Sequence, residues 1–87
     1  MPSFQSKKSW NTNSSHHLEK SFSFPNFLKA LQFVNQVGEL AEKANHHPDI
    51  FLSWGKVKIE LWSHDVDSVT DRDFSLADQI DLLHNRT

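Results

Sequence analysis

The sequence predicts an α+β fold, in which a four-stranded antiparallel sheet carries helices packed on one face. Residues 18–24 and 56–62 alternate apolar and polar side chains, which is typical of strands with one buried face. Residues 27–44 and 70–84 place apolar side chains at spacings near 3.6, which is typical of amphipathic helices. The order strand, helix, strand pair, helix favours one sheet covered by helices. Residues 1–87 are expected to form a single domain.

The first 17 residues are polar and rich in Ser and Asn, and an irregular lead-in is expected for them. Only Phe4 and Trp10 can anchor this segment, and a short strand is expected near Trp10. His16 and His17 lie in the same polar run. They are interpreted as exposed turn residues without a functional role.

The strand at residues 18–24 is predicted from side chains that share one parity. Leu18, Phe22 and Phe24 fall on one face of an extended chain. Lys20 falls on that face too and interrupts it.

The long helix is predicted to begin after Pro25 and Asn26, because Pro suits a first helical turn and Asn suits an N-cap. It is expected to end near Asn45, since Pro48 disfavours helical geometry at the residue before it. Its expected buried face consists of apolar residues at helical spacing: Phe27, Leu31, Val34, Val37, Leu40, Ala41 and Ala44.

A strand pair follows at residues 50–53 and 56–62, with a turn at Trp54 and Gly55. Trp62 falls on the polar face of the second strand. It either covers a ligand site or subunit contact or is a partly exposed aromatic at a strand end.

A second helix is predicted to begin after Thr70, an N-cap candidate with Asp73 at the third helical position. Its buried stripe is Leu76, Ile80 and Leu83, and it is expected to run to about His84.

Composition excludes several classes of function. The net charge is −2, which argues against nucleic-acid binding because phosphate contacts need clustered Lys and Arg. No apolar run approaches the ~20 residues of a membrane span, and the N-terminus lacks the apolar middle of a signal peptide. Cysteine is absent. A cytoplasmic protein with a modest core is expected, and oligomerisation is a common remedy for so small a core.

His46 and His47 stand where the long helix has to stop, and Glu42 lies one turn upstream. For a single histidine, a favourable interaction with the helix C-terminus is sufficient explanation. Metal binding is not expected, because adjacent histidines at a helix end tend to point apart and no HExxH spacing occurs. A serine hydrolase is unsupported, since no Gly-x-Ser-x-Gly elbow is present. General acid–base chemistry remains, because imidazole titrates near neutrality at ~6.5.

The spacing of these residues resembles the signature of the pterin-4a-carbinolamine dehydratases. In that family a charged residue, His-His-Pro, an aromatic residue, His and Asp follow one another with fixed spacers, and a Phe-x-Phe segment precedes the long helix. The resemblance covers roughly residues 10–83. Family members carry a short N-terminal helix, for which residues 1–9 look too short and polar. The matching residues are Glu42, His46, His47, Pro48, Trp54, His64 and Asp73.

The resemblance implies dehydration of 4a-hydroxytetrahydrobiopterin to the quinonoid dihydropterin, which recycles the pterin of aromatic amino-acid hydroxylases. The pterin is then a substrate, so neither a cofactor nor a metal is implied. The resemblance also implies the α+β fold and a homodimer or homotetramer. His46 and His64 would supply the proton transfers, His47 would position the pterin, and Glu42 would orient a histidine.

Further roles follow from the same resemblance. Asp73 is either the acidic site residue, a helix cap, or both, and Trp54 is a packing residue between strand and helix. The segments that would bind the pterin ring contain Asn45, His46, His47, Trp62, Ser63, His64 and Asp65.

Three alternatives stay open. The chain can be a non-catalytic or bifunctional protein-binding module, such as a dimerisation partner or an assembly factor on the same fold. It can act on another pterin, such as a molybdopterin-related intermediate. It can also be an α+β domain whose histidines are unrelated to catalysis.

Overall fold

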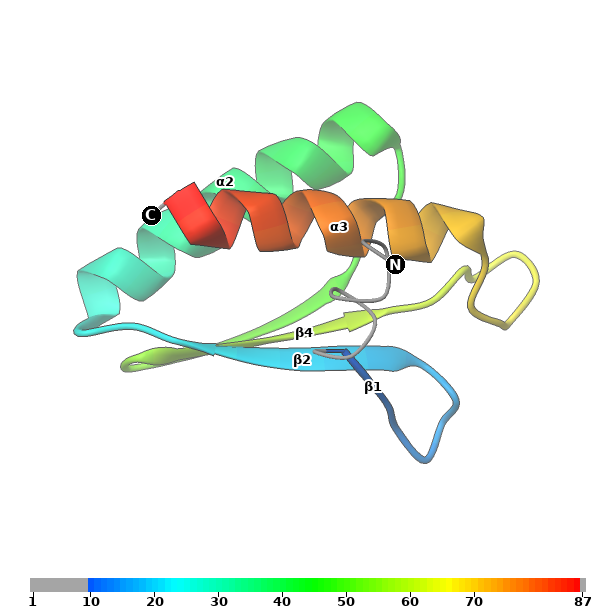
Figure 1. The fold of residues 1–87 in the computed structure, drawn as a ribbon, viewed down its shortest axis with the longest axis horizontal. Helices are drawn as coiled ribbons and strands as arrows, with labels where there is room; N and C mark the ends of the chain where they lie inside the picture. Colours follow the sequence, from blue (N-terminus) through cyan, green and yellow to red (C-terminus); the bar gives the residue numbers. More distant parts are fainter. Residues whose placement is uncertain (1–9, 87) are drawn as a thin grey trace.

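The computed structural model describes residues 10–86 and contains a four-stranded antiparallel sheet with two helices on one of its faces (Figure 1). The predicted α+β fold is therefore confirmed. The expectations for residues 1–9 lie outside the described residues. In chain order the elements are β1 (Asn11–Thr12), β2 (Leu18–Ser23), α2 (Phe27–Ala44), β3 (Asp49–Ser53), β4 (Lys56–Leu61) and α3 (Asp71–Arg86).

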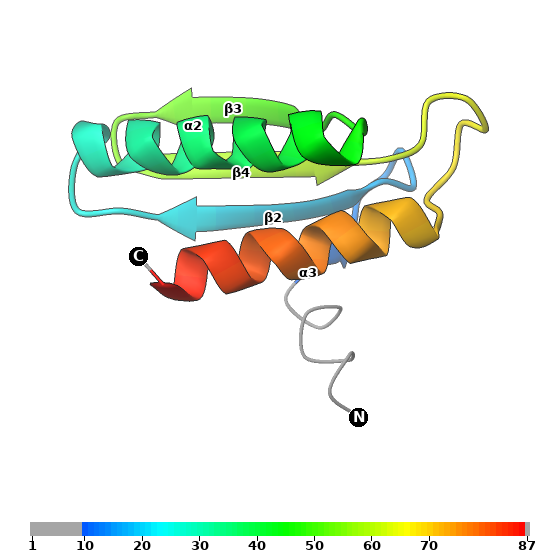
Figure 2. The ribbon, with the colours of Figure 1, turned by 90° about the horizontal axis from the view of Figure 1, so that it is seen from above.

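The strands are ordered β1-β2-β4-β3, and each neighbouring pair is antiparallel. Val57 of β4 lies opposite Phe22 of β2 on one side and Leu52 of β3 on the other. Figure 2 looks onto the helices and shows α2 in front of β3 and β4, with α3 along the β2 side of the sheet. The long connection from β2 to β3 therefore runs through α2, which covers the sheet that these strands share with β4.

The apolar parity of β4 is buried as predicted, since Val57, Ile59 and Leu61 are inaccessible to solvent. The predicted face of α2 was only partly right. Val37 and Ala41 are buried, and the core further includes Ala30 and Phe33, whereas the ends of the predicted stripe, Phe27 and Ala44, are exposed.

Aromatic packing explains why α2 turns this face to the sheet. The Phe33 ring lies 5.0 Å from the rings of both Phe22 and Phe24. Aromatic pairs in this range add about 0.5–1.5 kcal/mol beyond their area burial. Contacts with β2 therefore decide which of two overlapping apolar stripes of α2 is buried. Helical periodicity alone does not predict that outcome. The ring of His84 in α3 joins the same cluster, 4.9 Å from the ring of Phe22.

Lys20 can lie on the apolar face of β2 because a carboxylate on α3 pairs with its charge. Its Nζ lies 2.7 Å from Asp81 Oδ1 and 4.9 Å from the centroid of the Phe22 ring. Trp10 Nε1 donates a hydrogen bond of 3.0 Å to the same carboxylate. The charged residue thus ties α3 to the sheet.

The helix boundaries agree with the predicted caps. Asn26 accepts a hydrogen bond of 2.9 Å from the Lys29 backbone N–H, and Asn45 ends α2 in the left-handed conformation at φ 51°. The turn predicted at residues 54–55 is also present. There the Gly55 carbonyl accepts a 2.8 Å bond from the Phe24 N–H. Trp54 was expected to pack between strand and helix, but it is 69% exposed, because this turn extends past the end of the sheet.

Candidate active site

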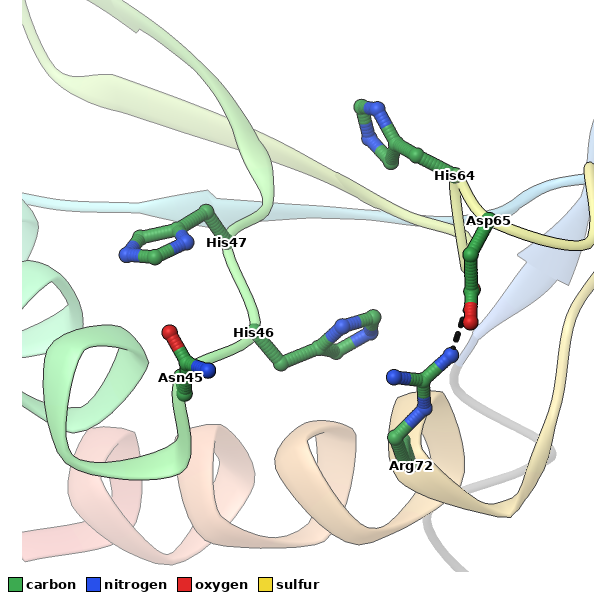
Figure 3. A pocket seen from close by; sticks show the side chains of 6 residues that line it. All are labelled: Asn45, His46, His47, His64, Asp65 and Arg72. Carbon is green, nitrogen blue, oxygen red and sulfur yellow. Dashed lines mark hydrogen bonds and ion pairs between the residues drawn. The ribbon is translucent and has the colours of Figure 1, made fainter.

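A pocket of about 340 Å³ opens where α2 ends, β4 ends and α3 begins (Figure 3). Three chain segments contribute to it: the α2–β3 connection, the loop after β4, and the first turn of α3. Residues that are far apart in the sequence therefore meet at one end of the sheet. The lining residues are Asn45, His46, His47, His64, Asp65 and Arg72.

The end of α2 turns both imidazoles out of the helical path. Asn45 donates its backbone N–H to the carbonyls of Ala41 and Glu42, and the His46 N–H bonds to Ala41 O at 3.1 Å. A left-handed residue followed by such a bond closes a helix without a further turn. Figure 3 shows the His46 and His47 rings leaving the backbone in opposite directions.

His46 is fixed by a carboxylate that lies wholly inside the protein. Its Nε2 lies 2.5 Å from Asp73 Oδ1, and the two side chains are 8% and 0% exposed. The other oxygen, Oδ2, accepts bonds of 2.8 Å from both Ser63 Oγ and the Thr70 backbone N–H. Asp73 therefore caps α3 and also contacts the His46 ring.

This geometry indicates which nitrogen of His46 is free to react. A carboxylate only accepts hydrogen bonds, so Nε2 carries the hydrogen that points to Asp73. The described residues hold no buried side-chain nitrogen or oxygen that lacks a partner. Nδ1 of His46 has no hydrogen-bond partner within them. A ring held by a buried carboxylate, with its second nitrogen open, suits proton transfer.

His47 is held by Glu42, whose Oε2 lies 2.5 Å from His47 Nε2. Glu42 thus pairs with the second histidine and not with His46, four residues downstream. The left-handed turn at Asn45 removes His46 from the helical path, so the i, i+4 relation no longer applies to it. Both members of the Glu42–His47 pair are more than half exposed, so their interaction is screened by water.

His64 reaches the pocket from the loop that follows β4. Among residues 10–86 no hydrogen bond holds its ring. Its contact is a stack on Trp62, with ring centroids 3.8 Å apart and planes 15° apart. His64 is therefore positioned by ring packing, whereas His46 and His47 are positioned by carboxylates.

Two residues that were grouped with the binding segments do not line the pocket. Ser63 is fully buried, and its hydroxyl bonds to Asp73 while its backbone N–H bonds to Ser68 O at 2.8 Å. Trp62 lies behind His64 as its stacking partner. Both residues support the site from outside its surface.

Arg72 is a pocket residue that sequence reasoning missed. Its guanidinium lies 2.6 Å from Asp65 Oδ1, and this hydrogen bond lowers the pKa of the Asp65 carboxyl. A cation in the first turn of a helix is disfavoured by the helix dipole, so its presence there needs another reason. That mismatch, directly beside Asp73, is the signal that could have identified it.

His17 was interpreted as an exposed turn residue, but the structure places it partly buried against Trp62. Its ring lies 4.2 Å from the Trp62 ring, with 5° between the planes. The chain reversal between β1 and β2 brings His17 to Trp62, and no sequence spacing indicates that contact. Within the described range, no group of three or more His, Asp or Glu side chains is arranged to hold a metal ion. No helix there is long and apolar enough to cross a membrane.

Comparison with known proteins places these features in one family. The sequence pattern described as Pterin 4 alpha carbinolamine dehydratase matches residues 2–83. A relative from Alkaliphilus metalliredigens, named after the same family, is 48% identical over 77 residues, which cover 88% of this chain and 69% of that protein. One from Rubrobacter xylanophilus, also named after it, is 50% identical over 74 residues, which cover 85% and 69%.

Two solved structures share the fold. The crystal structure of a transcriptional coactivator/pterin dehydratase from Brucella melitensis superposes with a TM-score of 0.86 at 26% identity, over 95% of this chain and 89% of that one. A pterin dehydratase-like protein, identified as a RuBisCO assembly factor in the alpha-carboxysome, gives a TM-score of 0.74 at 23% identity, over 87% and 89%. The second likeness is one of fold alone.

Proposed function

We propose that this chain, which belongs to the pterin-4-alpha-carbinolamine dehydratase family, converts 4a-hydroxytetrahydrobiopterin into quinonoid dihydrobiopterin and water. The reaction would recycle the pterin of aromatic amino-acid hydroxylases. The observation that carries this proposal is the pocket itself. It gathers three histidines from two distant segments, and one of them is fixed by a buried carboxylate.

The chemistry requires two proton transfers. The bond between C4a and its hydroxyl oxygen breaks, the neighbouring ring nitrogen loses its proton, and a C=N bond forms as water leaves. One group must protonate the leaving hydroxyl, and another must accept the proton from nitrogen. Imidazole can do either near neutral pH. His46 and His64 are the two groups proposed, because both line the pocket and each has a ring nitrogen without a partner in the described residues.

The remaining pocket residues would bind and orient the pterin. His47, Asn45, Asp65 and Arg72 surround the same space and offer donors and acceptors to a polar heterocycle. Trp62 and Ser63 leave the proposed set of contacts, because neither lines the pocket. The pterin is the substrate, and the proposed mechanism uses neither a cofactor nor a metal.

The test is dehydration of 4a-hydroxytetrahydrobiopterin generated in situ by an aromatic amino-acid hydroxylase. His46→Ala and His64→Ala should each lower the rate by about 10²–10⁴-fold, which is typical for loss of an acid–base group. His16→Asn is the matched control, since His16 is an exposed histidine outside the pocket and Asn tolerates its positive φ of 65°. Activity should also survive a chelator. A folded wild-type protein that does not accelerate dehydration over buffer refutes the proposal.

A protein-binding role is the second candidate, and it would use exposed apolar side chains. Contiguous exposed apolar patches mark contacts with other proteins, whereas single apolar side chains are ordinary on a protein surface. We expect a homodimer or homotetramer to cover part of this surface. Light scattering on the purified protein tests this, and a monomeric mass would contradict self-association. If the protein also lacked dehydratase activity, an assembly or dimerisation role would become the leading function. The exposed residues are Phe27, Leu28, Phe51, Trp54, Val66 and Leu82.

A further inference from the structure

Three rings form a stack that runs from the β1–β2 hairpin to the pocket. The His17 ring lies 4.2 Å from the Trp62 ring with 5° between their planes, and the His64 ring lies 3.8 Å from Trp62 with 15° between theirs. His64 lines the pocket, whereas His17 and Trp62 do not. We call these three residues the ring stack.

Trp62, the middle ring of the stack, and His17, one of its outer rings, are each held by a hydrogen-bonding partner. Trp62 Nε1 donates to Asp49 Oδ2 at 3.4 Å, which ties the indole to the start of β3. His17 Nδ1 lies 2.5 Å from Glu60 Oε2 on β4. Asn13 donates a bond of 3.0 Å to the same Glu60 oxygen. Hydrogen bonds from Asn13 and then from His17 lower the pKa of Glu60, so the carboxylate form is favoured where it anchors His17.

His64 depends on the ring stack in a way that the other two pocket histidines do not. His46 is held by Asp73 and His47 by Glu42. For His64, no hydrogen bond fixes the ring within residues 10–86, and the residue is exposed in a loop. An unrestrained side chain there would exchange between rotamers and be in any one orientation only part of the time.

We infer that Trp62 and His17 are positioning residues, which hold the His64 imidazole in the orientation needed for proton transfer. This inference rests on the proposed function, because it assigns His64 a proton to move. If this stack contributes as much as other aromatic pairs in proteins, it shifts such an equilibrium by roughly 2- to 10-fold. Loss of Trp62 should therefore lower kcat by about that factor. KM should stay unchanged, since Trp62 does not reach the pocket surface.

The first readout does not depend on activity. In a proton NMR spectrum of histidine side chains, the His64 ring protons should be shifted upfield by the indole face. His64→Gln identifies these signals by their loss. Trp62→Ser should return them to ordinary positions, and Trp62→Phe should retain part of the shift. His17→Asn should alter them less than Trp62→Ser, and His16→Asn should leave them unchanged.

The second readout is kinetic, on variants whose unfolding curves show that they are folded. Trp62→Ser should lower kcat by about 2- to 10-fold at constant KM, and Trp62→Phe should restore most of the rate. Unchanged His64 signals in Trp62→Ser would overturn the inference. A higher KM at constant kcat would overturn it as well, because Trp62 would then bind substrate directly.

The two proposals can fail separately. If the wild-type protein is inactive on the pterin, the proposed function fails and the catalytic part of this inference fails with it. If the wild-type protein is active and Trp62→Ser loses the His64 shift at full kcat, the positioning role alone is overturned.

Discussion

Replacing Asp73 by Asn tests the link between the buried carboxylate and the His46 ring. The substitution preserves shape but leaves one acceptor oxygen and adds an N–H₂ group. If that oxygen keeps the bonds from Ser63 and Thr70, the N–H₂ group faces His46 Nε2. Two donors cannot bond to each other, so His46 must move its hydrogen to Nδ1. The nitrogen proposed to exchange protons with the pterin would then be blocked.

The cost in stability can be worked from the hydrogen bonds. Bonds to a charged acceptor contribute about 1.5–3 kcal/mol and neutral ones about 0.5–1.5 kcal/mol, so two retained bonds weaken by about 1 kcal/mol each. A chain of 87 residues is stable by roughly 4–13 kcal/mol. The bond to His46 loses its charged acceptor as well, so Asp73→Asn should fold with a loss of about 2–3 kcal/mol. Asp73→Ala would strand three donors at about 1–3 kcal/mol each and is a poorer test.

The activity should fall much more than the stability. When a catalytic histidine is held in the wrong tautomer, kcat typically falls by about 10²–10⁴-fold. Urea unfolding followed by tryptophan fluorescence gives the stability, and the dehydration assay gives kcat. Nitrogen-15 NMR of the histidine side chains reports the tautomer of His46.

Ser63→Ala is the matched control, because it removes another donor to the same carboxylate and leaves His46 untouched. It should lose a similar amount of stability, about 1.5–3 kcal/mol, while kcat stays within a few-fold of wild type. Near-normal activity in Asp73→Asn would refute the reasoning, and so would an equally large loss in Ser63→Ala.

Three further predictions concern stability. Burial, and then the charge of the nearby Lys20, lowers the pKa of His84 below 6.5. The stability that His84 contributes in its neutral form is therefore complete above that pH and is lost as the pH falls. In urea titrations, wild type should lose more stability than His84→Gln between pH 7.5 and 5.5. Glu60 has a pKa below 4.5, so its contribution is present above that pH and declines in acid; an acid-unfolding curve should be less steep for Glu60→Gln. Gly55→Ala would place a Cβ 2.8 Å from the Phe24 carbonyl oxygen, so thermal unfolding should show a loss of about 1–3 kcal/mol, and an unchanged midpoint would contradict the crowding.

The helix ends and strand faces could be predicted because the signals for them are local. Asn26 and Asn45 are caps that bond within a few residues of themselves, and the parity of β4 needs only its own sequence. The rotation of α2 could not be predicted in the same way. It depends on where the rings of β2 lie, and Phe33 is chosen over Phe27 by partners that are distant in the sequence.

The same distinction between local signals and distant contacts applies to the candidate site. The histidines could be identified from spacing, because the helix end before Pro48 is a local feature. Which carboxylate holds which ring could not, since the partner of His46 lies 27 residues away. Arg72 bonds to Asp65, seven residues earlier, in a loop whose conformation the sequence pattern does not predict. His17 stacks on Trp62, and that contact forms only when β2 and β4 have paired.

The central claim is that His46 and His64 together dehydrate a 4a-hydroxypterin. The most direct measurement compares the dehydration rate of 4a-hydroxytetrahydrobiopterin in buffer, with wild-type protein, and with the folded His46→Ala/His64→Ala double variant. The account predicts acceleration by the wild-type protein and the buffer rate for the double variant. A wild-type protein that matches buffer, or a double variant that still accelerates the reaction, would contradict it.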